Sequence, residues 1–370
     1  MVVDQYAKSR RTSSTMPNPF RVAFLGVDNP HGHGWRELLR HLDGEIEIVA
    51  LMPGFGGGAT SLEERLASSP RFDSVEALLQ GADFDGAVVC LPNDAGPQAI
   101  TALAAGGKHV LAEKPVAGSA DDFRPAAKAL RNAGVAFQAG YMWRYDECAT
   151  RLREMVADGR FGRLISTEIN FVTSDVKRRD PEHYLFDADV SKGGFFNWLA
   201  CHQLDLVFYI LGRPVVGVTA RVGRFGPVEC DVEDGGAVIL DLEDGSLVTF
   251  VGGYWLPRWA GESTWATRGH QRWVNWNPGG RGTSGVLEIH GPMPQWIAME
   301  ETVTTEPDDT PGYGGARGAA LVRDWIDAAR SGGRDCRSTP ESVLATLELI
   351  DTIYEASRAE RRVERRIGAV

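Results

Sequence analysis

The residues best placed for chemistry are an acid and a lysine at the end of a short apolar run. Residues 110–112 (Val-Leu-Ala) have the composition of a buried strand and lead directly into Glu113, Lys114 and Pro115. Proline has no backbone donor and fixes its own φ, so the strand stops there. In a parallel sheet this places Lys114 at the carboxyl edge, where α/β folds bind ligands. A lysine there can donate a hydrogen bond or carry a proton, although a plain charged loop is the alternative.

A histidine and an aspartate form a second candidate pair, on the predicted helix 197–211. An unperturbed histidine titrates near neutral pH, which suits His202 to proton transfer. Asp205 follows three residues later and shares the same helix face. Asp205 either orients the imidazole or pairs with a lysine or arginine, and a packed His202 bonded to a carbonyl is the structural alternative. We treat Lys114, His202 and Asp205 as the candidate catalytic residues.

The first half of the chain has the pattern of a parallel sheet that would position Lys114. Short apolar runs alternate with helical patterns, which predicts an α/β, Rossmann-type sheet with helices on both faces. We expect strands at 21–26, 47–52, 86–91, 109–112 and 135–139, and helices at 35–42, 62–67, 75–79, 97–105 and 121–132.

The second half predicts an α+β domain with a large, mostly antiparallel sheet covered by helices on one face. Asp244-Gly245 between two strands is a hairpin signal. We expect helices at 149–157, 197–211, 319–330 and 340–359, and strands at 164–172, 215–222, 236–242, 247–253 and 285–290. The aromatic stretch 257–282 contains Trp259, Trp265, Trp273 and Trp276, and it predicts either sugar stacking or a packed loop or subunit interface.

Length and composition exclude several classes of protein. At 370 residues the chain is too long for one ordinary core, so we expect two domains. The net charge of -11 makes nucleic acid and anionic membranes poor partners. The five cysteines contain no C-x-x-C pair, and His31 and His33 lack a spaced third ligand, so we expect reduced thiols and no metal. Residues 1–19 are polar without a signal-peptide core, which predicts a flexible tail on a cytoplasmic protein without a membrane span.

Several motifs, in a fixed order, resemble those of the Gfo/Idh/MocA family of NAD(P)-dependent oxidoreductases. They are Leu91-Pro92-Asn93, residues 107–115 around Lys114, residues 140–145, Gly193-Gly194 with His202-Gln203-Leu204-Asp205, and residues 325–332. The resemblance implies a dinucleotide-binding Rossmann domain at 20–141 and a substrate-binding and oligomerisation domain at 142–370. It also implies NAD or NADP as cofactor, a small carbohydrate-like substrate, and a homodimer or homotetramer that buries the uncovered sheet face.

The phosphate-binding loop departs from the G-x-G-x-x-G fingerprint. Gly26 keeps the first position, but Asp28 and His31 replace the second and third glycines. A carboxylate facing a pyrophosphate would repel it, so we expect Asp28 to point away, with Asn29 as N-cap and Pro30 as first helical residue. The candidate cofactor contacts, including those implied by the family motifs, are Gly26, Asp28, Asn29, Pro30, His31, Pro92, Asn93, Glu113 and Lys114.

The end of the second strand leaves the choice between NAD and NADP open. Residues 51–54 (Leu-Met-Pro-Gly) stand where an acid usually holds the ribose 2′-OH. Arg65 would suit a 2′-phosphate, but it is equally a solvated helix residue.

The candidate catalytic helix also departs from the family. Trp198 stands four residues before His202, where the family has a carboxylate. The residues left to orient His202 are Glu168, Asp175, His183, Asp187 and Asp205. The resemblance places Arg144 near the domain junction, in a structural or a substrate-binding role. The candidate substrate contacts are Arg144, Asn197, Trp198 and His202.

These features favour an NAD(P)-dependent oxidoreductase acting on a sugar, polyol or related cyclic alcohol, with Lys114 and His202 managing the hydroxyl proton. One alternative is a redox-neutral enzyme that epimerises, eliminates or cleaves a glycoside through a keto intermediate. The other is a non-catalytic sugar- or dinucleotide-sensing protein on a decayed scaffold, favoured by Asp28 and Trp198.

Overall fold

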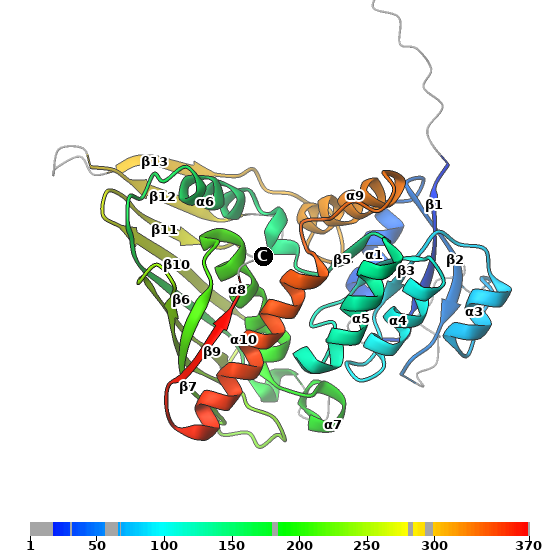
Figure 1. Ribbon diagram of the computed structural model, residues 1–370, viewed down its shortest axis with the longest axis horizontal. Helices are drawn as coiled ribbons and strands as arrows, with labels where there is room; N and C mark the ends of the chain where they lie inside the picture. Colours follow the sequence, from blue (N-terminus) through cyan, green and yellow to red (C-terminus); the bar gives the residue numbers. More distant parts are fainter. Residues whose placement is uncertain are drawn as a thin grey trace, which may run out of the picture.

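The chain folds around two β-sheets, one in each half of the sequence (Figure 1). In this computed structural model the described residues are 18–29, 32–55, 66, 68–179, 184–279, 284–292 and 299–368. Most of the predicted tail, the predicted helix 62–67 apart from Leu66, and both Pro30 and His31 lie outside them. Over the described ranges no helix is long and apolar enough to cross a bilayer.

The first sheet is parallel and confirms the predicted Rossmann-type fold. Its order is β2-β1-β3-β4-β5. The strands are β1 (Phe20–Leu25), β2 (Ile46–Met52), β3 (Gly86–Val89), β4 (His109–Ala112) and β5 (Phe137–Ala139). The helices between them are α1 (His33–His41), α3 (Val75–Gly81), α4 (Gly96–Ala105) and α5 (Ala120–Ala133). Ser74 and Ser119 start α3 and α5 by accepting hydrogen bonds from backbone amides of the first turn.

One helix of the second half, α9 (Ala316–Arg330), packs against this first sheet (Figure 1). Trp325 on α9 is fully buried in the same apolar cluster as Phe24 and Trp35. Gly86 makes room for its ring, since a Cβ there would lie 2.8 Å from the indole. The first domain in space thus gains a helix from beyond residue 142. The expected boundary at that residue stays a prediction.

The second sheet has nine strands in the order β13-β12-β11-β10-β6-β9-β8-β7-β14. Only β6 and β9 pair in parallel, which confirms a mostly antiparallel sheet. Its strands are β6 (Leu164–Ser174), β7 (Val215–Gly223), β8 (Gly235–Leu242), β9 (Leu247–Leu256), β10 (Gly261–Gly269), β11 (Trp273–Asn277), β12 (Val286–His290), β13 (Met299–Thr304) and β14 (Val363–Ile367). The predicted hairpin joins β8 to β9, where Gly245 has a φ of 83° that favours glycine.

The aromatic stretch forms two of the strands that the sequence did not predict. In the β10–β11 pair Trp265 lies opposite Trp276, and both rings are buried in the core. Packing therefore accounts for these two tryptophans. Trp259 is 71% exposed and Trp273 37% exposed, so they contribute to the surface instead.

Helices cover one face of the second sheet and lead back to the first domain. They are α6 (Glu147–Ala157), α8 (Cys201–Leu206) and α10 (Pro340–Ala359). Two π-helical turns, η6 (Phe196–Ala200) and η7 (Val207–Leu211), extend α8 on either side, so the predicted helix 197–211 is confirmed as a continuous but mixed element. Shorter turns are η3 (Met142–Tyr145), η4 (Val176–Arg179), η5 (Tyr184–Phe186) and α7 (Ala188–Ser191).

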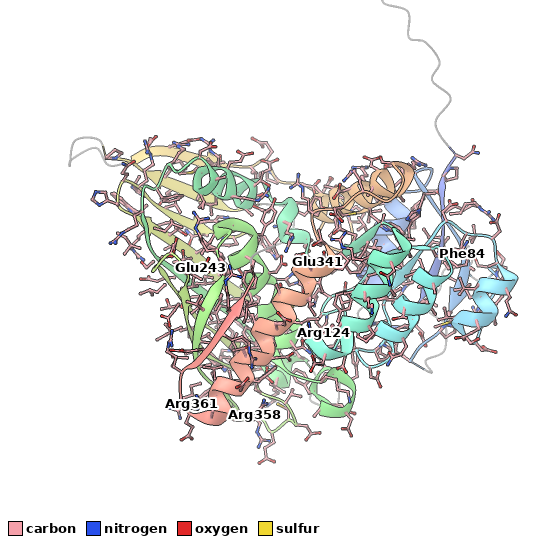
Figure 2. The ribbon with its side chains drawn as sticks, viewed as in Figure 1. Phe84, Arg124, Glu243, Glu341, Arg358 and Arg361 are labelled. Carbon is pink, nitrogen blue, oxygen red and sulfur yellow. The ribbon has the colours of Figure 1, made fainter. Side chains whose placement is uncertain are left out.

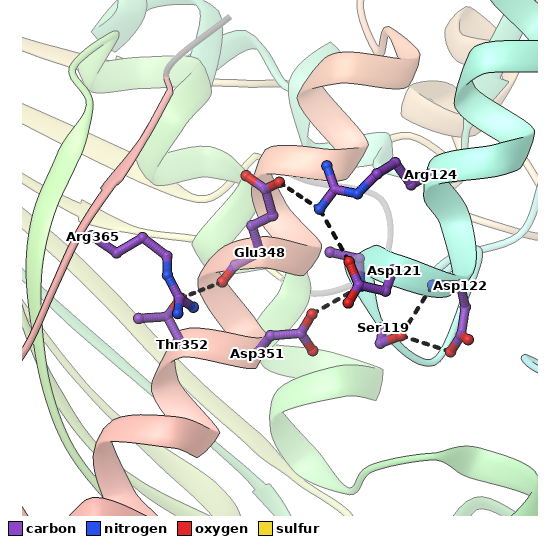
Figure 3. Close-up of polar contacts among 9 residues, drawn as sticks. Ser119, Asp121, Asp122, Arg124, Glu348, Asp351, Thr352 and Arg365 are labelled. Atoms are coloured by element: carbon purple, nitrogen blue, oxygen red, sulfur yellow. Dashed lines mark hydrogen bonds and ion pairs between the residues drawn. The ribbon is translucent and has the colours of Figure 1, made fainter.

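Helix α10 lies beside α5 and joins the two halves (Figure 3). Arg124 on α5 reaches Asp121 at 3.2 Å and Glu348 of α10 at 3.1 Å. The backbone amide of Ala120 donates to Asp351 at 2.9 Å, which ties the start of α5 to α10. Exposed ion pairs contribute little stability individually. The packing of α5 against α10 therefore holds the two sheets in their relative position, and the polar contacts favour this orientation of the two helices.

Candidate active site

Lys114 lies where the sequence places it, directly after β4 at the carboxyl edge of the first sheet. Its side chain is buried, and the Nζ atom donates to the backbone carbonyl of Trp198 at 2.7 Å. That carbonyl belongs to the π-helical turn η6 of the second domain. A π turn disturbs the i to i−4 hydrogen-bond ladder and frequently marks a functional site. The candidate lysine thus sits at the junction of the two domains.

Glu113 lies between Trp35 of α1 and Lys114. Its carboxylate accepts a hydrogen bond from the indole N–H of Trp35 on α1 and lies 3.8 Å from the Lys114 ammonium. Burial raises the pKa of Glu113, and the neighbouring Lys114 charge opposes that shift. We infer that Glu113 helps to hold Lys114 in place, and a direct cofactor contact by its side chain stays a prediction.

A chain of contacts links Lys114 to the nucleotide-binding loop through two aromatic residues. The rings of Trp198 and Tyr184 meet edge to face, with centroids 5.6 Å apart. The Tyr184 hydroxyl donates to Asn29 Oδ1 at 3.2 Å. Tyr184 was not among the predicted site residues. The aromatic cluster in His183-Tyr184-Leu185-Phe186, shortly before Gly193-Gly194, is the sequence signal that could have found it.

Two predicted site residues, Asn93 and Asn197, meet at one backbone carbonyl. Asn93 Nδ2 donates to the carbonyl of Ser191 at 2.7 Å, and Asn197 Nδ2 donates to the same oxygen at 3.2 Å. Asn197 is completely buried, and its Oδ1 has no hydrogen-bond partner among the described residues. An unsatisfied buried amide oxygen is costly, so Asn197 Oδ1 is an unusual feature of the domain junction.

His202 is buried on α8 without a carboxylate partner in the described part of the chain. Its Nδ1 makes no hydrogen bond there, and its ring faces Tyr141 edge-on at 6.0 Å. Burial, followed by the positive charges of Lys114 and Arg317, holds the pKa of His202 well below its usual value. The neutral form of the imidazole is therefore favoured, and one ring nitrogen of a neutral imidazole is a hydrogen-bond acceptor.

Asp205 pairs with Arg144 and not with His202. The two guanidinium nitrogens Nε and Nη2 donate to its carboxylate at 2.8 and 2.7 Å, and Thr346 adds a contact at 3.4 Å. Arg144 also donates to the backbone carbonyl of Arg337. The sequence left Asp205 either to orient His202 or to pair with a lysine or arginine, and the structure shows the pair with Arg144. The same contacts give Arg144 a structural setting. A catalytic role for Asp205 and a substrate contact by Arg144 stay predictions.

We expect Asp205→Asn to lower the free energy of unfolding by about 3–5 kcal/mol, because it leaves the buried Arg144 charge unpaired. The double variant Arg144→Met with Asp205→Leu should cost less than Asp205→Asn alone, since it removes both charges. Glu168→Gln, which breaks the exposed pair with Arg268, should change stability by less than about 1 kcal/mol. Urea unfolding measures all three, and equal losses for the buried and the exposed pair would contradict the argument.

The nucleotide-binding loop fits a dinucleotide in spite of its missing glycines. Gly26 has a φ of 70°, and a Cβ there would lie 2.3 Å from the carbonyl oxygen of Cys90, so only glycine suits the turn. Asp28 points away from the loop, as expected, and accepts hydrogen bonds from the amides of Gly54 at 2.7 Å and Phe55 at 3.0 Å. The carboxylate is therefore held at the end of β2, away from the Gly26 turn.

Helix α1 begins at His33, with Gly32 in the N-cap position. The predicted helix start at Pro30 lies outside the described residues, so the Asn29 cap stays a prediction. The Asn29 amide donates to Cys90 O at 2.8 Å. Arg36 is a loop residue that the sequence analysis missed. Its guanidinium donates to the carbonyl of Val27 at 2.6 Å and brings a positive charge beneath the loop. The sequence signal that could have identified Arg36 is an arginine in the first turn of the helix that follows a glycine-containing loop.

Glu233 also escaped the sequence analysis and positions the segment that carries His202. Its carboxylate accepts hydrogen bonds from the amides of Gly194 at 2.7 Å and Phe196 at 3.0 Å, and from the Tyr354 hydroxyl at 2.8 Å. A Cβ at Gly194 would lie 1.9 Å from the Glu233 carbonyl oxygen, which explains this glycine. Glu233, in the loop between β7 and β8, thereby fixes the first turn of the helical segment.

Comparison with known proteins agrees with this geometry in both domains. Residues 20–141 match the model of the oxidoreductase family with an NAD-binding Rossmann fold, and residues 149–271 match the GFO/IDH/MocA C-terminal domain. The chain belongs to the Gfo/Idh/MocA oxidoreductase family. The family membership expected from the motifs is therefore confirmed.

The individual proteins to which the chain is similar share only a low sequence identity with it. An inositol 2-dehydrogenase of Rhizobium meliloti (strain 1021) is 28% identical over 176 residues, which are 48% of this chain and 51% of that protein. A 2,7-anhydro-N-acetylneuraminate hydratase of Escherichia coli (strain K12) is 25% identical over 289 residues, or 76% of this chain and 72% of that protein. The chain thus spans about half the length of the first relative and nearly three quarters of the second.

Solved structures of family members share the whole fold. Levoglucosan dehydrogenase in complex with NADH and L-sorbose superposes with a TM-score of 0.80 over 96% of this chain and 100% of that one, at 15% identity. The aldose-aldose oxidoreductase from Caulobacter crescentus gives a TM-score of 0.76 over 94% and 100% of the two chains, at 20% identity. At these identities the structures establish the architecture.

Proposed function

We propose that this member of the family is an NAD(P)-dependent dehydrogenase of a sugar, polyol or related cyclic alcohol. The observation that carries the proposal is the pairing of a buried ammonium with a buried neutral imidazole at the domain junction. Lys114 is fixed by the Trp198 carbonyl, and the Nδ1 atom of His202 has no partner among the described residues. A donor and an acceptor of this kind suit a hydroxyl that gains or loses its proton.

The roles of the residues follow from these contacts. Nicotinamide, when bound, exchanges a hydride with the carbinol carbon of the substrate. Lys114 donates a hydrogen bond from Nζ to the reacting oxygen, where the charge develops. His202, in its neutral form, would accept a hydrogen bond from the substrate hydroxyl at Nδ1 and take its proton as the hydride leaves the carbinol carbon. The backbone around Gly26 would hold the pyrophosphate, and Asn93, Asn197 and Trp198 line the junction where nicotinamide and substrate would meet.

We further propose that Asp28 makes NAD the preferred cofactor. The second strand ends without the usual acid, but the amides of Gly54 and Phe55 hold the Asp28 carboxylate at that same strand end. In Rossmann domains an acid at this place accepts hydrogen bonds from the adenosine ribose, and its charge repels a 2′-phosphate. A residue of the first loop would thus replace the missing acid of the second strand.

Calorimetric titration with NAD⁺, NADH, NADP⁺ and NADPH measures both parts of the cofactor proposal. We expect NADH to bind in the micromolar range, about -8 kcal/mol, and at least about tenfold more tightly than NADPH. Asp28→Asn should narrow that ratio because it removes the repelling charge while keeping the side-chain size. Asp158→Asn, an equal charge change at the exposed end of α6, should leave the ratio unchanged.

The outcomes of this titration separate the two proposals. If none of the four nucleotides binds, the dehydrogenase proposal fails. If NADH and NADPH bind equally well to the unaltered protein, only the role of Asp28 fails.

A redox-neutral reaction is the second candidate, and the setting of His202 favours it. A neutral histidine without an orienting carboxylate can also serve as the base that removes a proton next to a transient ketone. Such a reaction would end with the cofactor in its starting state. The similarity to a hydratase over 76% of the chain is consistent with this candidate. Substrate conversion without net change in nicotinamide absorbance would distinguish it from the dehydrogenase.

We also propose that the chain assembles into a dimer or tetramer through its large sheet. Several large apolar side chains on strands of that sheet are exposed, which is unusual for a free surface. They are Ile165, Ile239, Leu247, Val251, Trp273 and Val286. Sedimentation at about tens of micromolar should show a dimer or larger species, because an interface of standard size is occupied at that concentration. A clean monomer would contradict this expectation.

A further inference from the structure

We propose that a separate cavity behind the catalytic helix binds a phosphate group, either free or carried by a small ester. The cavity has a volume of about 250 Å³ and lies between η3, α6, η7 and the first turns of α10. Its lining residues are Arg144, Arg153, Phe208, Tyr209, Gly212, Cys336, Arg337, Ser342 and Ala345. Three of them are arginines and none is acidic. The proposed dehydrogenase reaction does not use this place, although Arg144 belongs to the family motif at residues 140–145.

Two of the three arginines hold charges that the described residues do not neutralise. The Arg153 guanidinium lies 4.8 Å from the centre of the Tyr209 ring and makes no ion pair or hydrogen bond within the described ranges. Arg337 lies 4.6 Å from the centre of the Tyr145 ring and donates to the carbonyl of Arg144 at 2.8 Å. Its side chain contacts no carboxylate there. Both side chains are exposed, and the contact with a tyrosine ring restricts each guanidinium group, which lowers the entropy lost when an anion binds.

The nearby carboxylates are each committed to another partner. Asp205 pairs with Arg144 and so offsets the charge of the third arginine. Asp324 binds Arg334 and the Tyr145 hydroxyl, as well as the backbone amide of Arg337. Asp335 and Glu341 both pair with Arg131 of α5, a helix of the first domain. The cavity therefore keeps a positive field.

The shape of the cavity fits a compact dianion. The 20-residue helix α10 begins here at Pro340, and Ser342 in its first turn lines the wall, so the positive end of the helix dipole adds to the arginines. Pockets for drug-sized ligands hold roughly 300–1,000 Å³, so this one suits a smaller molecule. Arginine forks match the tetrahedral oxygens of phosphate through paired hydrogen bonds.

The test is calorimetry on the whole protein with inorganic phosphate and with glucose 6-phosphate, at low and at moderate salt. We expect saturable binding of one equivalent that weakens as salt increases. Arg153→Gln should weaken it by about tenfold or more, because a charge-assisted contact is lost. Arg358→Gln removes the same charge at the far end of α10, where Figure 2 labels Arg358 well apart from Glu341, and should have no effect.

The outcomes of this test decide whether the cavity binds phosphate and whether the ligand is free phosphate or an ester. Tighter binding of the ester identifies a phosphate ester, whereas equal binding identifies free phosphate. Absence of saturable binding, or equal weakening by Arg153→Gln and Arg358→Gln, overturns the proposal. Displacement of phosphate by NADH would place it in the cofactor site and overturn the proposal as well. A protein that binds phosphate but no NADH would still support this cavity, so the test stands apart from the proposed dehydrogenase.

Discussion

Replacing Lys114 with alanine should lower kcat by about 10²–10⁴ while leaving the affinity for the nicotinamide cofactor nearly unchanged. The Nζ atom lies at the domain junction, bonded to the Trp198 carbonyl, and not at the Gly26 loop where a pyrophosphate would bind. Its contribution is thus made mainly where the substrate oxygen changes charge. Steady-state kinetics and a cofactor titration on the same preparation measure both quantities.

The control for this prediction is Lys128→Ala, which removes an exposed lysine of α5 and should leave kcat unchanged. Because Lys114 also binds the Trp198 carbonyl, urea unfolding of Lys114→Ala checks that the domain junction is intact. An intact Lys114→Ala variant with unaltered kcat would show that the lysine is structural and that the proposed mechanism is wrong.

The double variant of Lys114 and His202 should lose far less activity than the product of the two single losses. Both side chains act on one proton, so removing the second group costs little once the first is gone. His202→Ala alone should cost a similar or smaller factor than Lys114→Ala, because no described carboxylate orients its imidazole. The kcat values of the two single variants and the double variant measure this coupling. Multiplicative losses would mean that the two residues act in separate steps.

Most of the fold follows from sequence pattern because its signals are local. The first sheet alternates apolar strands with helices, and its predicted strands match β1 to β5 within a few residues. The second sheet was predicted less completely. Strands β10 and β11 are dominated by tryptophans that pair across the sheet, such as Trp265 with Trp276, and only tertiary packing reveals them. The short β14 depends on a partner more than a hundred residues away and carries three charged residues.

The candidate site shows what spacing can and cannot establish. The Glu113-Lys114-Pro115 motif places the lysine at the sheet edge without any structure. Spacing does not reveal side-chain partners in the same way, because Asp205, three residues after His202 on the same helix, pairs with Arg144 of η3. The turning of Asp28 toward β2, expected on electrostatic grounds, also removes one of the two reasons to regard the chain as a decayed enzyme.

The most direct measurement of the central claim is a substrate panel followed at the absorbance band of reduced nicotinamide. The protein would be incubated with its preferred oxidised cofactor and a series of inositols, aldoses, anhydrosugars and glycosides, with Lys114→Ala as the blank. We predict that at least one cyclic alcohol produces reduced nicotinamide at a rate that Lys114→Ala lowers by about 10² or more. Firm cofactor binding with no conversion of any sugar or polyol would contradict the assignment of this chain as a dehydrogenase.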